Sequence, residues 1–202
     1  MKSKNVIITI VVVLIAAVSL LAKIARVELV SKVVLSANAG EDVEQKRKLV
    51  WTYHQQGNRQ SAIQAAEEYL ELAPRDSEVW VLLAEHYMGS DKLTEAERAI
   101  KEALKLNPNS LWGLRTSAGI YRLKAEQSPQ LKQKYLSMAQ LDIEKALGIA
   151  PDDEHVNEQA AQIYLVQGER NKALQAVNKA LELEPEEKRL LDLKKQILSG
   201  TE

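Results

Sequence analysis

The chain has 202 residues, of which 46% are hydrophobic and 27% charged, and it contains no cysteine, which excludes an acylated lipoprotein and a cysteine nucleophile. Residues 1–40 hold five basic side chains and one acidic side chain, so residues 41–202 hold 22 basic and 27 acidic ones, a net charge near −5. Because binding to phosphates needs clustered positive charge, we expect no nucleic-acid partner for this larger part.

The N-terminal segment has the pattern of a membrane anchor. Residues 1–5 form a short basic tail, and residues 6–22 are a run of 17 residues without a charged side chain. A run of this length is at the short end of what spans a bilayer, and Lys23 can extend it by reaching toward the headgroups. We therefore predict a transmembrane signal anchor over residues 6–25 and a juxtamembrane stalk over residues 26–42.

A cleaved signal peptide is the alternative to this anchor, because a basic start and an apolar core are common to both. The small residues Ala17 and Ser19 lie inside the apolar run, whereas Ala37 and Ala39 lie far beyond it, and this favours the anchor. Basic residues are nearly balanced on the two sides of the span. A short tail before a single span resembles bacterial inner-membrane proteins, so we expect the rest of the chain on the periplasmic side of that membrane.

Four prolines divide the remainder of the chain at regular intervals. They are Pro74, Pro108, Pro151 and Pro185, separated by 34, 43 and 34 residues. Each follows a helical pattern, which is typical of repeats built from helix pairs. With the proline at position 32 of each unit, the units are residues 43–76, 77–110, 111–153 and 154–187.

Tyrosine and alanine recur at fixed positions of these units. Position 11 is tyrosine in every unit: Tyr53, Tyr87, Tyr121 and Tyr164. Position 20 is alanine in every unit: Ala62, Ala96, Ala139 and Ala173. Position 8 is Ala84, Ala118 and Ala161, with the bulkier Val50 in the first unit. Paired helices about 10 Å apart approach closely only where both carry small side chains, so we predict these alanines at the helix crossings.

This combination of period, alanine, tyrosine and proline resembles the tetratricopeptide repeat family, whose repeat is a helix–turn–helix unit. The resemblance covers residues 43–187 and departs from the family pattern at position 4, where only Trp80 is aromatic. It implies an all-α fold, an α-solenoid of four helix pairs. We expect the N-terminal transmembrane helix before this solenoid and a capping helix after it.

The third unit is nine residues longer than the others, and the excess lies between Tyr121 and Ala139. Ser128 followed by Pro129 has the pattern of a helix start, which predicts two lengthened helices that project from the solenoid. The projection carries the basic residues Arg122, Lys124, Lys132 and Lys134 against the single acid Glu126. Lys124, Lys132 and Lys134 are a candidate second contact surface for an acidic partner, and the alternative is a solvated spur.

Residues 188–202 follow the last unit and are predicted to be the capping helix and a tail. An apolar stripe is expected to cover the last repeat. Its members are Leu190, Leu191, Leu193, Ile197 and Leu198. Gly200 is expected to end this helix, just as Gly40 is expected to mark the break before the first unit.

The chain has no glycine-rich phosphate loop and no nucleophile motif, so we expect no enzymatic activity and no cofactor. The densest polar cluster, residues 152–155, directly follows Pro151, where acids favour a helix N-terminus. We interpret this cluster as helix capping rather than as a metal site. His54 and His86 have no partner at metal-ligand spacing and are expected to touch solvent.

In proteins of this kind, the first helices of successive repeats line a concave groove, so the resemblance implies that a partner binds there. The predicted partner-binding residues are Arg47, Trp51, His54, Val81, Glu85, Met88, Trp112, Arg115, Arg122 and Leu165. Exposed tryptophan near arginine is typical of a peptide anchor. The alternative is that Trp51 and Trp112 fold back against neighbouring helices or the stalk.

One familiar mode of binding is not expected. Repeats that clamp the C-terminal carboxylate of a chaperone use lysine, asparagine and arginine, whereas the matching positions here are Arg47, Trp51, Leu82, Trp112 and Thr116. Only the arginine has suitable chemistry, so we do not expect a chaperone tail as the ligand.

These patterns predict a non-enzymatic, membrane-tethered scaffold or adaptor that binds a partner protein or peptide and assembles a membrane-associated complex. A narrower version is a cytochrome-maturation or envelope-assembly factor. The alternative is a constitutive structural subunit of a larger membrane complex. Association with a second copy of the chain is left open.

Overall fold

The computed structural model describes residue 26 and residues 40–200, and residues from Arg47 onward form one compact unit. The predicted basic tail, the anchor over residues 6–25 and most of the stalk lie outside the described residues. Within the described part, no helix combines the length and the apolar character needed to cross a membrane.

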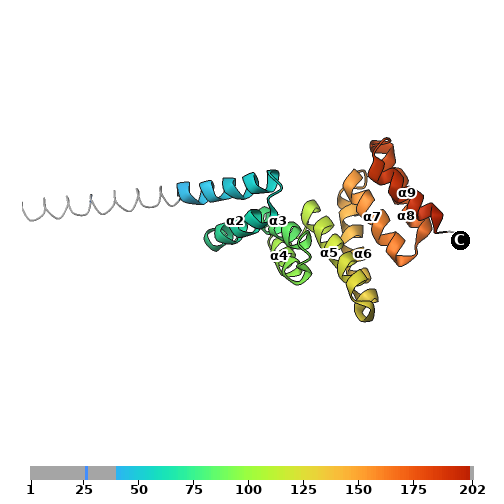
Figure 1. Ribbon diagram of the computed structural model, residues 1–202, viewed down its shortest axis with the longest axis horizontal. Coiled ribbons are helices and arrows are strands. Elements are labelled where there is room, and N and C mark those ends of the chain that lie inside the picture. Colours follow the sequence, from blue (N-terminus) through green and yellow to red (C-terminus); the bar gives the residue numbers. More distant parts are fainter. Residues whose placement is uncertain (1–25, 27–39, 201–202) are drawn as a thin grey trace, which may run out of the picture. The chain divides into compact units, whose positions relative to one another are not determined.

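Regular secondary structure in the described residues is entirely helical (Figure 1). Residues 40–55 are helical and precede the labelled elements. The elements are α2 (Arg59–Leu72), α3 (Ser77–Met88), α4 (Leu93–Leu106), α5 (Leu111–Gln127), the 3₁₀ helix η1 (Pro129–Leu131), α6 (Lys132–Ile149), α7 (Glu154–Gln167), α8 (Arg170–Leu183) and α9 (Lys188–Ser199). The predicted all-α solenoid is therefore confirmed.

The helices pack as successive pairs. α3 packs on α4, α5 on α6, and α7 on α8, and each pair contacts the next through its neighbouring helices. α9 packs on α8 and α7, as expected of a helix that covers the last pair. In addition, α3 contacts α5 and α5 contacts α7, so the first helices of successive pairs lie side by side.

The first helices start where the prolines predict. The side chains of Asp76, Ser110 and Asp153, each two residues after a proline, accept hydrogen bonds from backbone N–H groups at the starts of α3, α5 and α7. Such caps satisfy donors that have no partner inside the helix. The interpretation of the acidic cluster after Pro151 as a helix cap is confirmed at Asp153.

The small residues predicted for the helix crossings are buried. The alanines at positions 8 and 20 of every unit, together with Val50, have 0% exposure. Among the repeated tyrosines, Tyr121 and Tyr164 are buried, and Tyr87 is half-buried with its hydroxyl donating to Glu67. The tyrosines thus contribute buried area, and the hydroxyl of Tyr87 finds its polar partner near the surface.

The third pair has the predicted lengthened helices. α5 has 17 residues and α6 has 18, against 12 to 14 for the other described α-helices from α2 onward. Pro129 is at the start of η1 rather than of a long α-helix, and the Ser128 side chain makes no capping hydrogen bond. The predicted helix start is therefore a 3₁₀ turn that leads into α6.

Two expectations about helix ends need correction. In α9, Leu190, Leu193 and Ile197 are buried, but Leu191 and Leu198 are 46% and 49% exposed. These two leucines are seven residues apart, so they share a face beside the buried stripe rather than within it. Gly40 is helical and does not break the chain before the first unit.

Enlarging a crossing alanine should destabilise the fold. Ala96→Leu places three extra carbon atoms at a site with no exposed surface, and we expect a loss of about 1–3 kcal/mol in the free energy of unfolding, measured with urea. Thr94→Leu, at an exposed position of the same helix, is the control and should change stability by less than about 0.5 kcal/mol. Equal effects of the two substitutions would show that position 20 is not a packing constraint.

Candidate functional site

The surface formed by residues 47–55, α3 and α5, the first-helix face, carries four aromatic rings in contact, which we call the ring cluster. Trp51 lies 6.1 Å from Trp112 between ring centroids and meets the edge of His54 at 5.8 Å. His54 in turn lies 5.2 Å from His86. Trp51 and Trp112 come from the first and third pairs, so the two indoles approach each other across the helix of the second pair.

Both tryptophans are half-buried and pack against each other. This arrangement combines the two interpretations drawn from the sequence. The indoles do not stand free in solvent, yet they remain on the surface of the first helices. Offset or tilted aromatic pairs at this separation are favourable beyond the area that they bury.

Glu85 on α3 organises the polar groups beside the indoles. Its Oε1 atom accepts hydrogen bonds from Trp112 Nε1 at 2.6 Å and from Thr116 Oγ1 at 3.1 Å, and a guanidinium nitrogen of Arg115 lies 3.7 Å away. The Arg115 side chain is 31% exposed. Arg115 therefore keeps donors available to a ligand, whereas the carboxylate of Glu85 is already engaged.

The indole nitrogen of Trp51 is in a different situation. It is buried and makes no hydrogen bond to any described residue. A buried donor without an acceptor costs about 1–3 kcal/mol. The ring cluster thus contains one unsatisfied polar group.

Arg47 is held by acids of its own chain. It donates to Asp76 Oδ2 and to Glu78 Oε2, both at 2.8 Å, and its guanidinium lies 5.9 Å from the Trp51 ring centroid. Burial alone would raise the pKa of Asp76, but hydrogen bonds from Arg47 and Tyr69 outweigh it and keep that pKa below its usual value. Arg47 therefore links the first pair to the start of α3 and is less available to a partner than we expected.

The other residues predicted for the groove are dispersed. Val81 is 1% exposed and belongs to the core, whereas Met88 is half-buried on α3. Arg122 and Leu165 line a separate hollow of about 510 Å³ between α5, α7 and α9. The structure thus brings Arg47, Trp51, His54, Glu85, Trp112 and Arg115 together, whereas Val81 lies in the core and Arg122 and Leu165 lie at the separate hollow.

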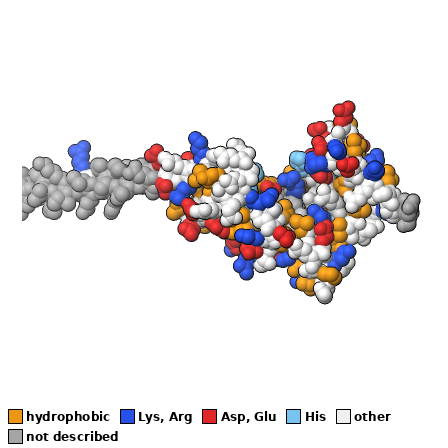
Figure 2. All heavy atoms as spheres, in the orientation of Figure 1, with side chains coloured by type: hydrophobic (Ala, Val, Ile, Leu, Met, Phe, Trp, Pro, Cys, Tyr) orange, Lys and Arg blue, Asp and Glu red, His pale blue; other side chains and the backbone are white. Residues whose placement is uncertain are grey.

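The basic residues of the third pair differ in their surroundings. Lys132 and Lys134 are exposed, but Lys124 is largely buried, pairs with Glu97 of α4 and lies 4.9 Å from the Tyr135 ring. Burial alone would lower the pKa of Lys124, but pairing with Glu97 raises it. Lys124 therefore ties α5 to α4 and is not free to bind an acidic partner. Acidic and basic side chains are intermixed over the face seen in Figure 2.

His86 corrects the expectation that both histidines touch solvent. It is 8% exposed, and its Nε2 lies 3.2 Å from His54 Nδ1. Burial lowers the pKa of His86 to about 4, and the neighbouring His54 and Arg59 add to this effect. The two histidines are 32 residues apart in the sequence but meet because they lie on the first helices of adjacent pairs. A search of the sequence for short metal-ligand spacings does not reveal this contact.

Glu154, His155 and Glu158 form the acidic group most similar to a metal site among the described residues, with ligand atoms within 4.8 Å of one another. Arg189 of α9 lies 3.5 Å from Glu154 Oε1 and 2.8 Å from Glu158 Oε2. His155 also pairs with Glu154 at 2.7 Å. These contacts make the group an ion-pair network that joins α7 to the capping helix.

Comparison with known proteins identifies the repeats. The sequence pattern of the tetratricopeptide repeat matches residues 53–117 and residues 155–187. The chain therefore contains tetratricopeptide repeats over these residues, and the resemblance drawn from the spacing is confirmed there. A comparison with curated protein sequences found no match.

Several solved structures share the fold at low sequence identity. A thermophilic tetratricopeptide repeat protein of Thermus thermophilus is 22% identical with a TM-score of 0.71, covering 79% of this chain and 83% of that chain. MamA of Desulfovibrio magneticus is 18% identical with a TM-score of 0.61, covering 78% and 89%. PilF of Pseudomonas aeruginosa is 18% identical with a TM-score of 0.64, covering 81% and 70%. Similarity at this level shows the fold alone.

Acid should destabilise the chain through His86. Its folded-state pKa is about 4 and its ordinary value 6.5, so the unfolded chain binds the extra proton between these values. The stabilisation is full above pH 6.5 and is lost as the pH falls toward 4, by on the order of 2–3 kcal/mol. The free energy of unfolding, measured with urea at several pH values, should fall less steeply toward low pH for His86→Gln than for the wild-type chain. Parallel curves for the two proteins would contradict this assignment.

Proposed function

We propose that this chain is a non-enzymatic, membrane-tethered adaptor that holds a partner protein or peptide on its first-helix face and so assembles a membrane-associated complex. Its tetratricopeptide repeats support a role in protein–protein interaction. The apolar run at residues 6–22 and the basic residues before it support the tether. Tethering raises the effective concentration of the bound partner at the membrane.

The ring cluster is the observation that carries the proposed binding surface. Two indoles from different pairs meet at 6.1 Å, and the partly exposed Arg115 lies beside them. Tryptophan and arginine are enriched among the residues that contribute most to binding at protein interfaces, because one supplies a large rigid area and the other pairs with carboxylates. We infer that an apolar side chain of the partner packs on the indoles while a carboxylate or carbonyl pairs with Arg115.

Trp51 adds a second reason to place the partner here. Its indole nitrogen is buried without an acceptor, so the unbound face carries an energetic cost. A modest rotation of the indole on binding would let a backbone carbonyl of the partner accept this hydrogen bond. In the bound state, the indole N–H of Trp51 would then have the acceptor that it lacks in the free state.

A constitutive structural subunit of a larger membrane complex is the second candidate function. Leu141 on α6 is 69% exposed and Leu131 at the end of η1 is 44% exposed, so the lengthened third pair presents apolar surface to solvent. Exposed apolar residues of this size are typical of interaction surfaces when they gather in one patch. Binding that persists in detergent and high salt at equal stoichiometry would favour this candidate over a reversible adaptor.

The adaptor proposal is tested by partner capture with Trp112 variants. Full-length chain is used to capture partners from solubilised membranes, and bound proteins are quantified by mass spectrometry. Trp112→Ala should lower capture of the principal partner at least about tenfold, the loss expected for a central aromatic anchor.

Trp112→Phe is the matched variant, because it keeps an aromatic ring while it removes the indole N–H that donates to Glu85 and part of the ring area. It should retain intermediate capture. Circular dichroism should show the same helicity for the wild-type chain and both variants. Equal capture by Trp112→Ala and the wild-type chain would remove the first-helix face as the binding surface.

A further inference from the structure

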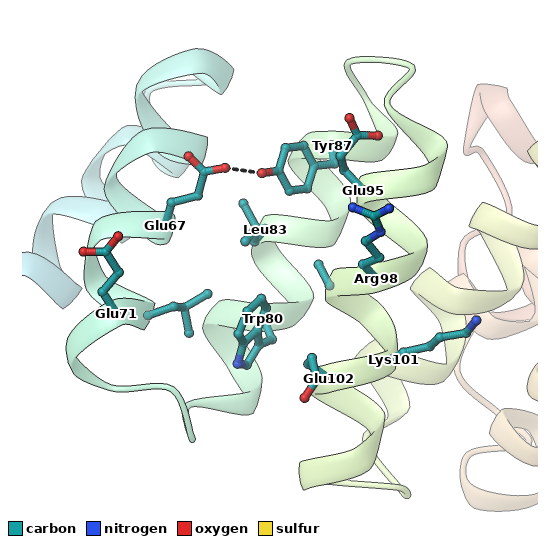
Figure 3. A pocket seen from close by; sticks show the side chains of 11 residues that line it. Glu67, Glu71, Trp80, Leu83, Tyr87, Glu95, Arg98, Lys101 and Glu102 are labelled. Carbon is teal, nitrogen blue, oxygen red and sulfur yellow. Dashed lines mark hydrogen bonds between the residues drawn. The ribbon is translucent and has the colours of Figure 1, made fainter.

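A groove of about 660 Å³ lies on another surface of the molecule, between the second helices α2 and α4, with α3 as its floor (Figure 3). Trp80, Leu83 and Tyr87 form the floor at the spacing i, i+3 and i+7, and Leu70 and Ala99 contribute apolar walls. This volume is within the range of ordinary ligand pockets. An apolar stripe between two helices is the shape that accepts the apolar face of another helix.

Acidic side chains stand along both sides of this groove. Glu67 and Glu71 come from α2, and Glu95 and Glu102 come from α4 (Figure 3). Two cations also line the groove, Arg98 and Lys101, and Lys101 is already paired with Glu97 at 2.6 Å. The rim is therefore negative, while the floor is apolar.

The chain contains a second groove of the same construction, between α6 and α8 with α7 as its floor, and its volume is about 350 Å³. Residues at equivalent places in the two grooves differ by 77 in number, which is the distance from Pro74 to Pro151. Tyr164 is then equivalent to Tyr87, but two of the charges at the rim are reversed. Lys172 stands in place of Glu95, and Lys179 in place of Glu102.

The floor differs as well, at position 4 of the repeat. Trp80 Nε1 donates a hydrogen bond to the carbonyl of Pro74 at 2.9 Å, and the equivalent Asn157 Nδ2 donates to the carbonyl of Pro151 at 2.8 Å. The local structural role of the position is thus met by asparagine. The hydrogen bond at position 4 therefore does not require the large apolar area of Trp80, and the second groove forms without an acidic rim.

From this internal comparison we propose that the α2–α4 groove is a docking site for a basic amphipathic helix of a partner protein. The apolar face of the helix packs on Trp80, Leu83 and Tyr87, and its lysines or arginines pair with Glu71, Glu95 and Glu102. Charge complementarity selects a basic segment and disfavours an acidic one. This site is separate from the first-helix face and does not depend on the adaptor proposal.

The test uses two synthetic amphipathic helices with the same leucine face, one carrying lysines and the other glutamates on its polar face. Binding of each labelled peptide to the full chain is measured by fluorescence anisotropy at low and at physiological salt. The lysine peptide should bind at least about tenfold more tightly than the glutamate peptide, and its affinity should fall as salt is added. Equal affinities of the two peptides would overturn the proposal.

Two variants locate the binding on the groove. Trp80→Asn keeps the type of hydrogen bond seen at Asn157 and should weaken binding of the lysine peptide at least about tenfold. The double variant E95K/E102K copies the charges of the other groove at exposed positions and should abolish the preference for the lysine peptide.

The control for charge is E182K/E186K, which alters net charge by the same amount at exposed positions outside the groove. It should leave most of the preference for the lysine peptide intact. Unchanged binding by both E95K/E102K and Trp80→Asn would overturn the proposal. Loss of peptide binding in Trp112→Ala but not in Trp80→Asn would overturn it as well, since the peptide would then bind to the first-helix face.

Discussion

The close approach of paired helices at small side chains is the constraint on which the rest of this structure depends. The residues at positions 8 and 20 of the repeat, alanines except for Val50 in the first unit, are completely buried. Stacking of such pairs places the first helices next to one another. Only in that arrangement can Trp51 and Trp112, from the first and third pairs, meet across α3 at 6.1 Å.

The same stacking produces surfaces whose chemistry is set by side chains that packing does not fix. The α2–α4 and α6–α8 grooves share an equivalent floor tyrosine, yet one has a tryptophan floor with glutamates and the other has asparagine with lysines. On the first-helix face, Glu85 holds Trp112 and Thr116, while Arg115 keeps donors free. A repeated scaffold thus carries distinct sites, as expected when function resides in the decoration of a common fold.

The fold could be predicted from the sequence because its determinants are local and periodic: the spacing of Pro74 and its equivalents, the alanines and the caps recur in every unit. The site could be predicted only in part. Whether Val81 is buried, Lys124 is paired with Glu97, or His54 meets His86 depends on contacts between different helices, which periodicity does not encode. The α2–α4 groove escaped prediction for the same reason, since three helices contribute to it.

The central claim, that a partner protein binds on the first-helix face, is tested most directly by photo-crosslinking from position 112 in intact membranes. Position 132, exposed at the start of α6, is the comparison, and captured proteins are identified by mass spectrometry. The account predicts a discrete partner protein crosslinked at position 112, with far less of it at position 132. Capture only at position 132, or only of another copy of this chain, would contradict the account and favour a structural subunit.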